Sequence, residues 1–155
     1  MADRFAATCF QTAVETTPGE TIGNLFNAPA APTSRLGIYY IALSAGGTMA
    51  DVVCHYVIQR TTALGTEASG VVPENLDNGA VQGGADAGQD HSAEPTYTAA
   101  TEFWENDVHL RALAQIQLQP DGHILVAGTQ NNGVGVTVFS ASYTGIAYET
   151  IHFVE

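Results

Sequence analysis

Apolar and polar residues alternate along several stretches of this chain, with the period of two that is typical of half-buried β-strands. In the clearest stretch, 109–119, every second residue from Leu110 to Leu118 is apolar, and the positions between them are polar except Leu113. Helical spacing would mix the two sets, so the pattern predicts a strand. Similar patterns predict further strands at 3–14, 22–26, 36–44, 52–62, 123–126, 134–139 and 146–154.

Turn signals between these stretches indicate the architecture. Pro120-Asp121-Gly122 and Asn132-Gly133 are predicted to reverse the chain, because these residues favour the backbone angles of tight turns. We predict an all-β chain of about 8–9 strands with little helix, the best helical candidate being 98–107. The chain should form one domain, 1–155, folded as an antiparallel β-sandwich. A jelly roll is one form of that fold, and a closed barrel is the alternative.

Two segments depart from the regular alternation. The segment 77–93 is rich in glycine and acids and holds little apolar bulk, which predicts a long surface loop. The segment 146–154 is apolar on both faces, so we expect a strand that is central in its sheet or covered by a partner chain.

Charge excludes several classes of partner. The chain has 155 residues and a formal net charge of −12, from 16 acids and four arginines without any lysine. Phosphate binding needs clustered positive charge, so we expect neither nucleic acid nor an anionic membrane as a partner. No apolar stretch approaches the ~20 residues of a membrane helix. The N-terminus does not resemble a secretory signal, so we expect the chain to be made in a cytoplasm.

Potential metal ligands are scattered along the sequence. His109 and His123 could face each other across the turn at 120–122 and bind zinc, although a solvent-facing polar pair is the interpretation we favour. The acids of 77–90 could bind calcium, but they lack the spacing of an EF-hand loop. We therefore expect no metal and no cofactor.

No catalytic constellation stands out, and we expect no enzymatic activity. Cys54 and His55 are neighbours in a predicted strand, so their side chains should point to opposite faces. The nucleophile motif G-x-S-x-G is missing from the sequence. We expect Cys54 to be a buried thiol, and whether it pairs with Cys9 is left open.

Aromatic residues and acids meet at Phe103 and Trp104, which Glu102, Glu105 and Asp107 flank. An aromatic platform beside carboxylates is what a sugar site or a glycosidase offers. Aromatic residues are also enriched at protein interfaces, and we favour an interface anchor here.

Four segments of the first two thirds of the chain carry a family resemblance. The segments 36–51, 56–66, 72–77 and 92–96 have the sequences LGIYYIALSAGGTMAD, YVIQRTTALGT, VPENLD and SAEPT. This order resembles the capsid decoration (cement) and related head-surface proteins of tailed bacteriophages. The matching positions are Gln59, Arg60, Thr61, Gly65, Pro73, Leu76, Asp77, Glu94, Pro95 and Thr96.

The resemblance implies a non-enzymatic virion protein on the outer surface of an icosahedral head. There it would bind the major capsid protein, stabilise contacts between its subunits and form a homotrimer. It implies terminal or connecting arms at 1–10 and 28–33. It also implies that Arg60 pairs with a carboxylate, either of the capsid or within this chain, and we favour an internal ion pair with Asp77. The candidate contact residues are Arg4, Phe5, Arg60, Phe103 and Trp104. The alternatives are a carbohydrate- or receptor-binding β module of a phage tail or fibre, and a small glycosidase or lyase.

Overall fold

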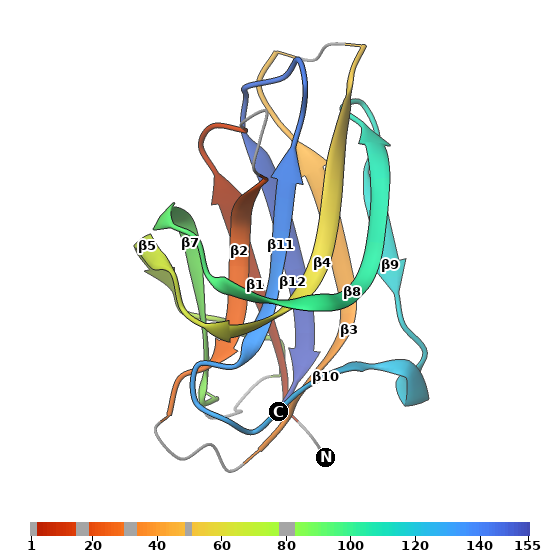
Figure 1. The fold of residues 1–155 in the computed structure, drawn as a ribbon. Coiled ribbons are helices and arrows are strands. Elements are labelled where there is room, and N and C mark those ends of the chain that lie inside the picture. Colours follow the sequence, from red (N-terminus) through yellow and green to blue (C-terminus); the bar gives the residue numbers. More distant parts are fainter. Residues whose placement is uncertain (1–2, 15–18, 30–33, 49–50, 78–82) are drawn as a thin grey trace.

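The computed structural model describes residues 3–14, 19–29, 34–48, 51–77 and 83–155. These residues form twelve strands and one short 3-10 turn, η1 (Pro120–Gly122), without an α-helix (Figure 1). The strands are β1 (Arg4–Gln11), β2 (Glu20–Asn27), β3 (Leu36–Ala45), β4 (Val53–Ala63), β5 (Thr66–Val71), β6 (Glu74–Asn75), β7 (Ala85–Ala93), β8 (Thr96–His109), β9 (Ala114–Gln117), β10 (Ile124–Val126), β11 (Gly133–Phe139) and β12 (Ala147–Val154). The all-β prediction is confirmed, with more strands than the 8–9 expected.

Two antiparallel sheets pack face to face as a sandwich (Figure 1). The first sheet has the order β10–β3–β12–β1–β6, with β9 also paired to β3. The second sheet has the order β5–β7–β2–β11–β4–β8. The set β1–β12–β3–β9/β10 lies opposite the set β2–β11–β4–β8, which is the strand arrangement of a jelly roll. Strands β5, β6 and β7 are additions that come between β4 and β8 in the chain.

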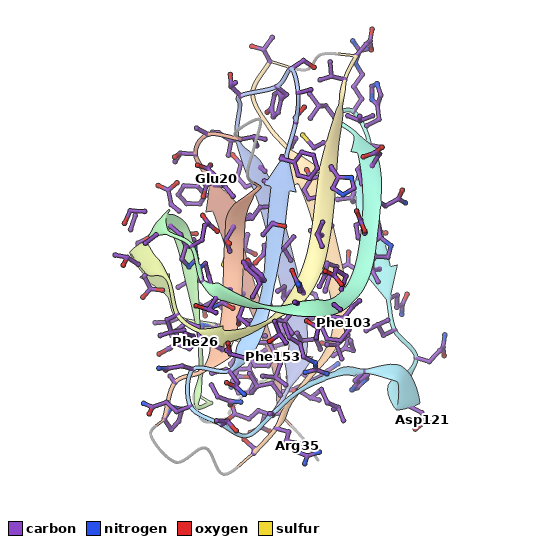
Figure 2. The ribbon with its side chains drawn as sticks, in the orientation of Figure 1. Glu20, Phe26, Arg35, Phe103, Asp121 and Phe153 are labelled. Atoms are coloured by element: carbon purple, nitrogen blue, oxygen red, sulfur yellow. The ribbon has the colours of Figure 1, made fainter. Side chains whose placement is uncertain are left out.

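Strands β9 and β10 together form one interrupted edge of the first sheet. β9 pairs with Tyr40–Leu43 of β3, and β10 pairs with Leu36–Ile38 of the same strand, both antiparallel. The turn predicted at 120–122 therefore does not reverse the chain. After β9 the chain leaves the edge of β3, passes through η1 and rejoins the same edge as β10, which runs in the same direction as β9. Asp121 projects from this excursion at the periphery of the molecule (Figure 2).

The prediction of a loop over 77–93 is wrong for most of its length. Ala85–Ala93 forms β7, which lies between β5 and β2 in the second sheet. Ala85 and Ala87 are buried in the core, and the ladders to both neighbouring strands satisfy the backbone. A strand paired on both sides needs little side-chain bulk to be held in a sheet. Residues 78–82 lie outside the described residues.

The helix considered for 98–107 is a strand. β8 first crosses the outer side of the second sheet and then bends to run along β4 (Figure 1). The hydroxyl of Tyr97 lies 2.6 Å from that of Thr21 on β2. A Cβ at Gly135 on β11 would lie 2.5 Å from the same Tyr97 hydroxyl. The missing side chain at Gly135 therefore lets the crossing strand pack closely on the sheet.

The N-terminal segment belongs to the sandwich. All eight residues of β1 pair with β12, so the described part of the arm predicted at 1–10 is a sheet strand. β12 in turn lies between β1 and β3, so of the two alternatives for the last strand the structure shows the central position. Of the arm considered at 28–33, residues 30–33 lie outside the described residues.

Candidate functional site

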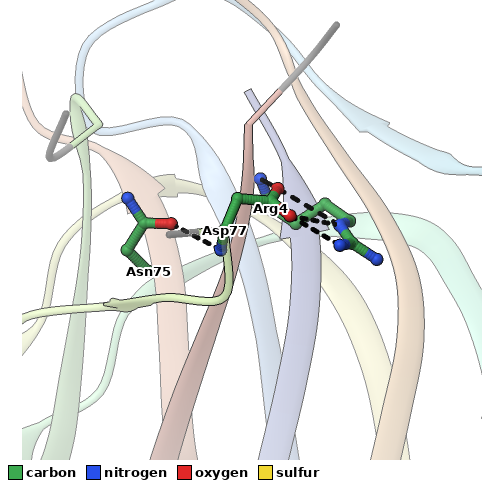
Figure 3. A network of polar contacts seen from close by, with 3 residues as sticks. All are labelled: Arg4, Asn75 and Asp77. Atoms are coloured by element: carbon green, nitrogen blue, oxygen red, sulfur yellow. Dashed lines mark hydrogen bonds and ion pairs between the residues drawn. The ribbon is translucent and has the colours of Figure 1, made fainter. Parts of the chain in front are cut away.

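The two candidate contacts on β1 have internal partners. Phe5 is 2% exposed and stacks on Phe153 with ring centroids 5.5 Å apart, so it belongs to the core and is not a contact residue. The Arg4 guanidinium binds Asp77 through Nη2 to Oδ1 at 2.5 Å and Nε to Oδ1 at 3.0 Å (Figure 3). The Asn75 side chain accepts a hydrogen bond from the Asp77 amide at 2.8 Å. Arg4 holds the pKa of Asp77 below its usual value, so this pair is neutralised within the chain.

Arg60 does not pair with Asp77, which corrects the internal bridge favoured from the sequence. Its Nη1 donates to the carbonyl oxygen of Leu125 at 2.7 Å, and its guanidinium carbon lies 4.8 Å from the centre of the Phe103 ring. This contact is a cation–π interaction and covers one side of an aromatic residue that is 37% exposed. Trp104 is half-buried and packs against the core.

The acids around Trp104 bind the neighbouring strand. Asp107 and Glu105 lie 2.8 and 2.9 Å from Nδ1 and Nε2 of His55, respectively. Glu102 accepts a hydrogen bond from Gln59 at 3.2 Å. These side chains hold β8 to β4, a structural role that does not need a sugar substrate.

The described residues contain no group of three or more His, Cys, Asp or Glu side chains that could hold a metal ion. His109 lies 3.9 Å from Asp51, whereas the His123 ring lies beside Tyr39, so the two histidines have different surroundings. Cys9 and Cys54 are both buried free thiols, which confirms the expectation for Cys54 and answers the open question of a disulfide.

An open surface that the sequence analysis missed lies on the outer side of the first sheet. Residues that pair across antiparallel strands point to the same face, so the register defines three rows. We call this surface the aromatic face; its rows are Ala6–His152–Tyr40–Gln117, Thr8–Thr150–Ala42–Gln115 and Phe10–Tyr148–Ser44. None of these residues is an acid or an arginine, although the chain carries 16 acids.

Aromatic rings line one end of this face. The ring of His152 lies 4.9 Å from that of Tyr40 and 6.0 Å from that of Tyr39. Together with Ala42, Gln117 and Thr150 they border a depression of about 430 Å³. Partial burial lowers the pKa of His152, so its imidazole is neutral at pH 7. The face is therefore uncharged under neutral conditions and offers rings, hydroxyls and amides to a partner.

The chain matches no protein-family model, no curated protein and no solved structure. The resemblance to phage decoration proteins therefore stays a prediction. Within the part of the chain that the structure describes, no helix has the length and hydropathy needed to cross a membrane.

Proposed function

We propose that this chain is a non-enzymatic structural protein of a bacteriophage virion. It binds the outer surface of an icosahedral head as a decoration protein and docks there through the aromatic face. One observation carries the choice of surface, which is that three rows of outward residues are free of acids and arginines in a chain with a net charge of −12.

The physical argument concerns the cost of burying charge. A carboxylate that loses its water without gaining a partner costs several kcal/mol, so the centres of protein interfaces are depleted of acids and enriched in tyrosine. The aromatic face meets both conditions, and its hydrogen-bonded sheet loses little conformational entropy on docking. Jelly rolls also occur in viral capsid domains, although a fold alone does not define a function.

The proposed mechanism is mass action. A protein that binds the assembled shell and not its free subunits stabilises the shell in proportion to its concentration. The partner is the major capsid protein, and the decoration protein acts as a homotrimer that bridges neighbouring capsid subunits.

A charge placed at the centre of the aromatic face tests this proposal. Ala42 lies between Thr150 and Gln115 in the middle row. Ala42→Arg should weaken the binding of this chain to assembled phage capsids, measured by co-sedimentation, by at least about a hundredfold. An unpaired charge in an interface costs on the order of 3 kcal/mol, which corresponds to that factor. Ser92→Arg, at an exposed position of the second sheet, is the matched control and should bind like the wild type.

Two outcomes would contradict the proposal. One is equal capsid binding by Ala42→Arg and the wild type, since the aromatic face would then lie outside the interface. The other is a wild-type chain that does not sediment with capsids at all. Light scattering of the free protein tests the trimer separately.

The depression supports a carbohydrate-binding module as a second candidate. Its volume of about 430 Å³ lies in the range of small-ligand sites, and its border combines tyrosine rings with the Gln117 amide and the Thr150 hydroxyl. Glycan binding on an array that Tyr40→Ala abolishes, and that Trp104→Ala leaves intact, would favour this function over capsid binding.

A further inference from the structure

Two of the four arginines of the chain form ion pairs with acids, and the other two do not within the described residues. Arg4 binds Asp77, and Arg111 lies 3.2 Å from Asp51. Arg35 and Arg60 form no ion pair within the described residues. Acids outnumber bases by 16 to 4, yet two of the four arginines have no carboxylate partner within the described residues.

The two unpaired arginines line the same depression. It has a volume of about 260 Å³, and its other walls are Leu125, Val126 and Ala127. Among the described residues that line it, none is an acid. Arg35 directly precedes β3 at the end of the sandwich that also holds the C-terminus (Figure 2), and Arg60 lies near the end of β4. Two cationic side chains, one next to the start of β3 and one on β4, therefore border the same depression with its apolar wall.

The Arg60 guanidinium is held in place before any ligand arrives. Nη1 donates to the Leu125 carbonyl at 2.7 Å, and the Phe103 ring lies against the guanidinium at 4.8 Å. A guanidinium has five N–H donors, and only the one to Leu125 has a hydrogen-bond partner among the described residues. The remaining donors are fixed in orientation, which reduces the entropy lost when an anion binds.

We infer that Arg35 and Arg60 form a binding site for a carboxylate on an apolar stem, such as a glutamate side chain of a partner protein. The guanidinium groups bind the two oxygens, and Leu125, Val126 and Ala127 contact the hydrocarbon stem. The net charge of −12 disfavours polyanions, so an isolated carboxylate fits the site better than a nucleic acid. This inference does not depend on the capsid proposal, because a single glutamate side chain of any partner protein could supply the group.

The test is a titration followed by ¹H–¹⁵N NMR of the full chain. The probe is the peptide acetyl-Ala-Glu-Ala-amide, and its matched control is acetyl-Ala-Gln-Ala-amide. We expect the glutamate peptide to shift the amide signals of Leu125, Val126 and Ala127 and the glutamine peptide to leave them unchanged. Glutarate in a separate titration shows whether a free dicarboxylate binds as well as the peptide side chain does.

Three variants assign the binding to the two arginines. Arg35→Gln and Arg60→Gln should each raise the dissociation constant of the glutamate peptide about tenfold, because each removes a charged hydrogen-bond donor. Arg111→Gln removes the same charge elsewhere and should bind like the wild type. If Arg60→Gln unfolds, the affinity of Arg35→Gln for the glutamate peptide still tests the inference. Arg35 is exposed and its side chain makes no hydrogen bond within the described residues, so this substitution should leave the fold intact.

Three results would overturn the inference. They are equal shifts by the glutamine and glutamate peptides, unchanged affinity in both arginine variants, and tighter binding of inorganic phosphate than of the glutamate peptide. Each is independent of capsid sedimentation, so a failure here and a failure of the proposed function can be distinguished.

Discussion

Glu149 gives the sharpest test of the sandwich interior. It lies on the inner side of β12, opposite Cys9 of β1, and is only 1% exposed. Among the described residues, neither of its carboxylate oxygens has a hydrogen-bond partner. Burial raises the pKa of Glu149 from 4.5 to about 8, an increase that the neighbouring Cys9 thiol partly offsets. The folded chain therefore holds Glu149 protonated at neutral pH.

The size of the effect follows from proton linkage. Between pH 4.5 and about pH 8 the folded state holds a proton on Glu149 that the unfolded state releases. The contribution to stability is complete below pH 4.5 and is lost as the pH rises to about 8. The loss amounts to about 1.4 kcal/mol per pH unit within this window. Glu149→Gln has nearly the shape of the protonated acid and does not titrate. From pH 5 to pH 8 its free energy of unfolding should rise relative to the wild type by about 3 kcal/mol.

The assay is urea unfolding followed by circular dichroism at pH 5, 6, 7 and 8. The midpoints of Glu149→Gln and the wild type should lie close together at pH 5 and separate as the pH rises, with unchanged slopes. Glu74→Gln makes the same substitution at an exposed position, and its curves should stay parallel to those of the wild type. A constant difference between Glu149→Gln and the wild type at all four pH values would refute the reasoning.

Two further predictions concern packing. Gly135→Ala should lower the free energy of unfolding by about 1–3 kcal/mol, because its Cβ would meet the Tyr97 hydroxyl at 2.5 Å. The control is Gly122→Ala, where a Cβ has no neighbour within 4 Å, and its free energy of unfolding should stay close to that of the wild type in a parallel urea titration. Equal effects of the two substitutions would contradict the close crossing of β8. In the same assay, Phe5→Ala should lower the free energy of unfolding by about 3–5 kcal/mol and Phe103→Ala by less than about 1 kcal/mol, since only Phe5 is fully buried. A small loss of stability in Phe5→Ala would contradict its place in the core and favour the contact role expected from the sequence.

Local patterning was sufficient for the strands whose side chains differ clearly in polarity. The apolar residues on both faces of 146–154 predicted a strand that is central or covered by a partner chain, and β12 is central, between β1 and β3. The same reasoning failed for 85–93, because Ala85 and Ala87 are small yet fully buried. The prediction relied on large hydrophobic side chains, whereas β7 is held in place by hydrogen bonds to a strand on each side.

The candidate site depends on register, which local patterns do not contain. Ala6, His152, Tyr40 and Gln117 form one row of the aromatic face, yet they come from four strands that are distant in sequence. No single segment shows that the row lacks charge. The Arg60 partner was missed for the same reason, because Leu125 lies beside it only when β10 continues the edge begun by β9.

The most direct test of the central claim is a cryo-electron microscopy map of capsids incubated with this chain. The account predicts trimers on the outer surface of the shell, with the Tyr40–His152 end of the aromatic face buried against the major capsid protein. A map in which the chain is bound with that face toward solvent would contradict the proposed docking surface. Shells without any bound density would contradict the decoration function itself.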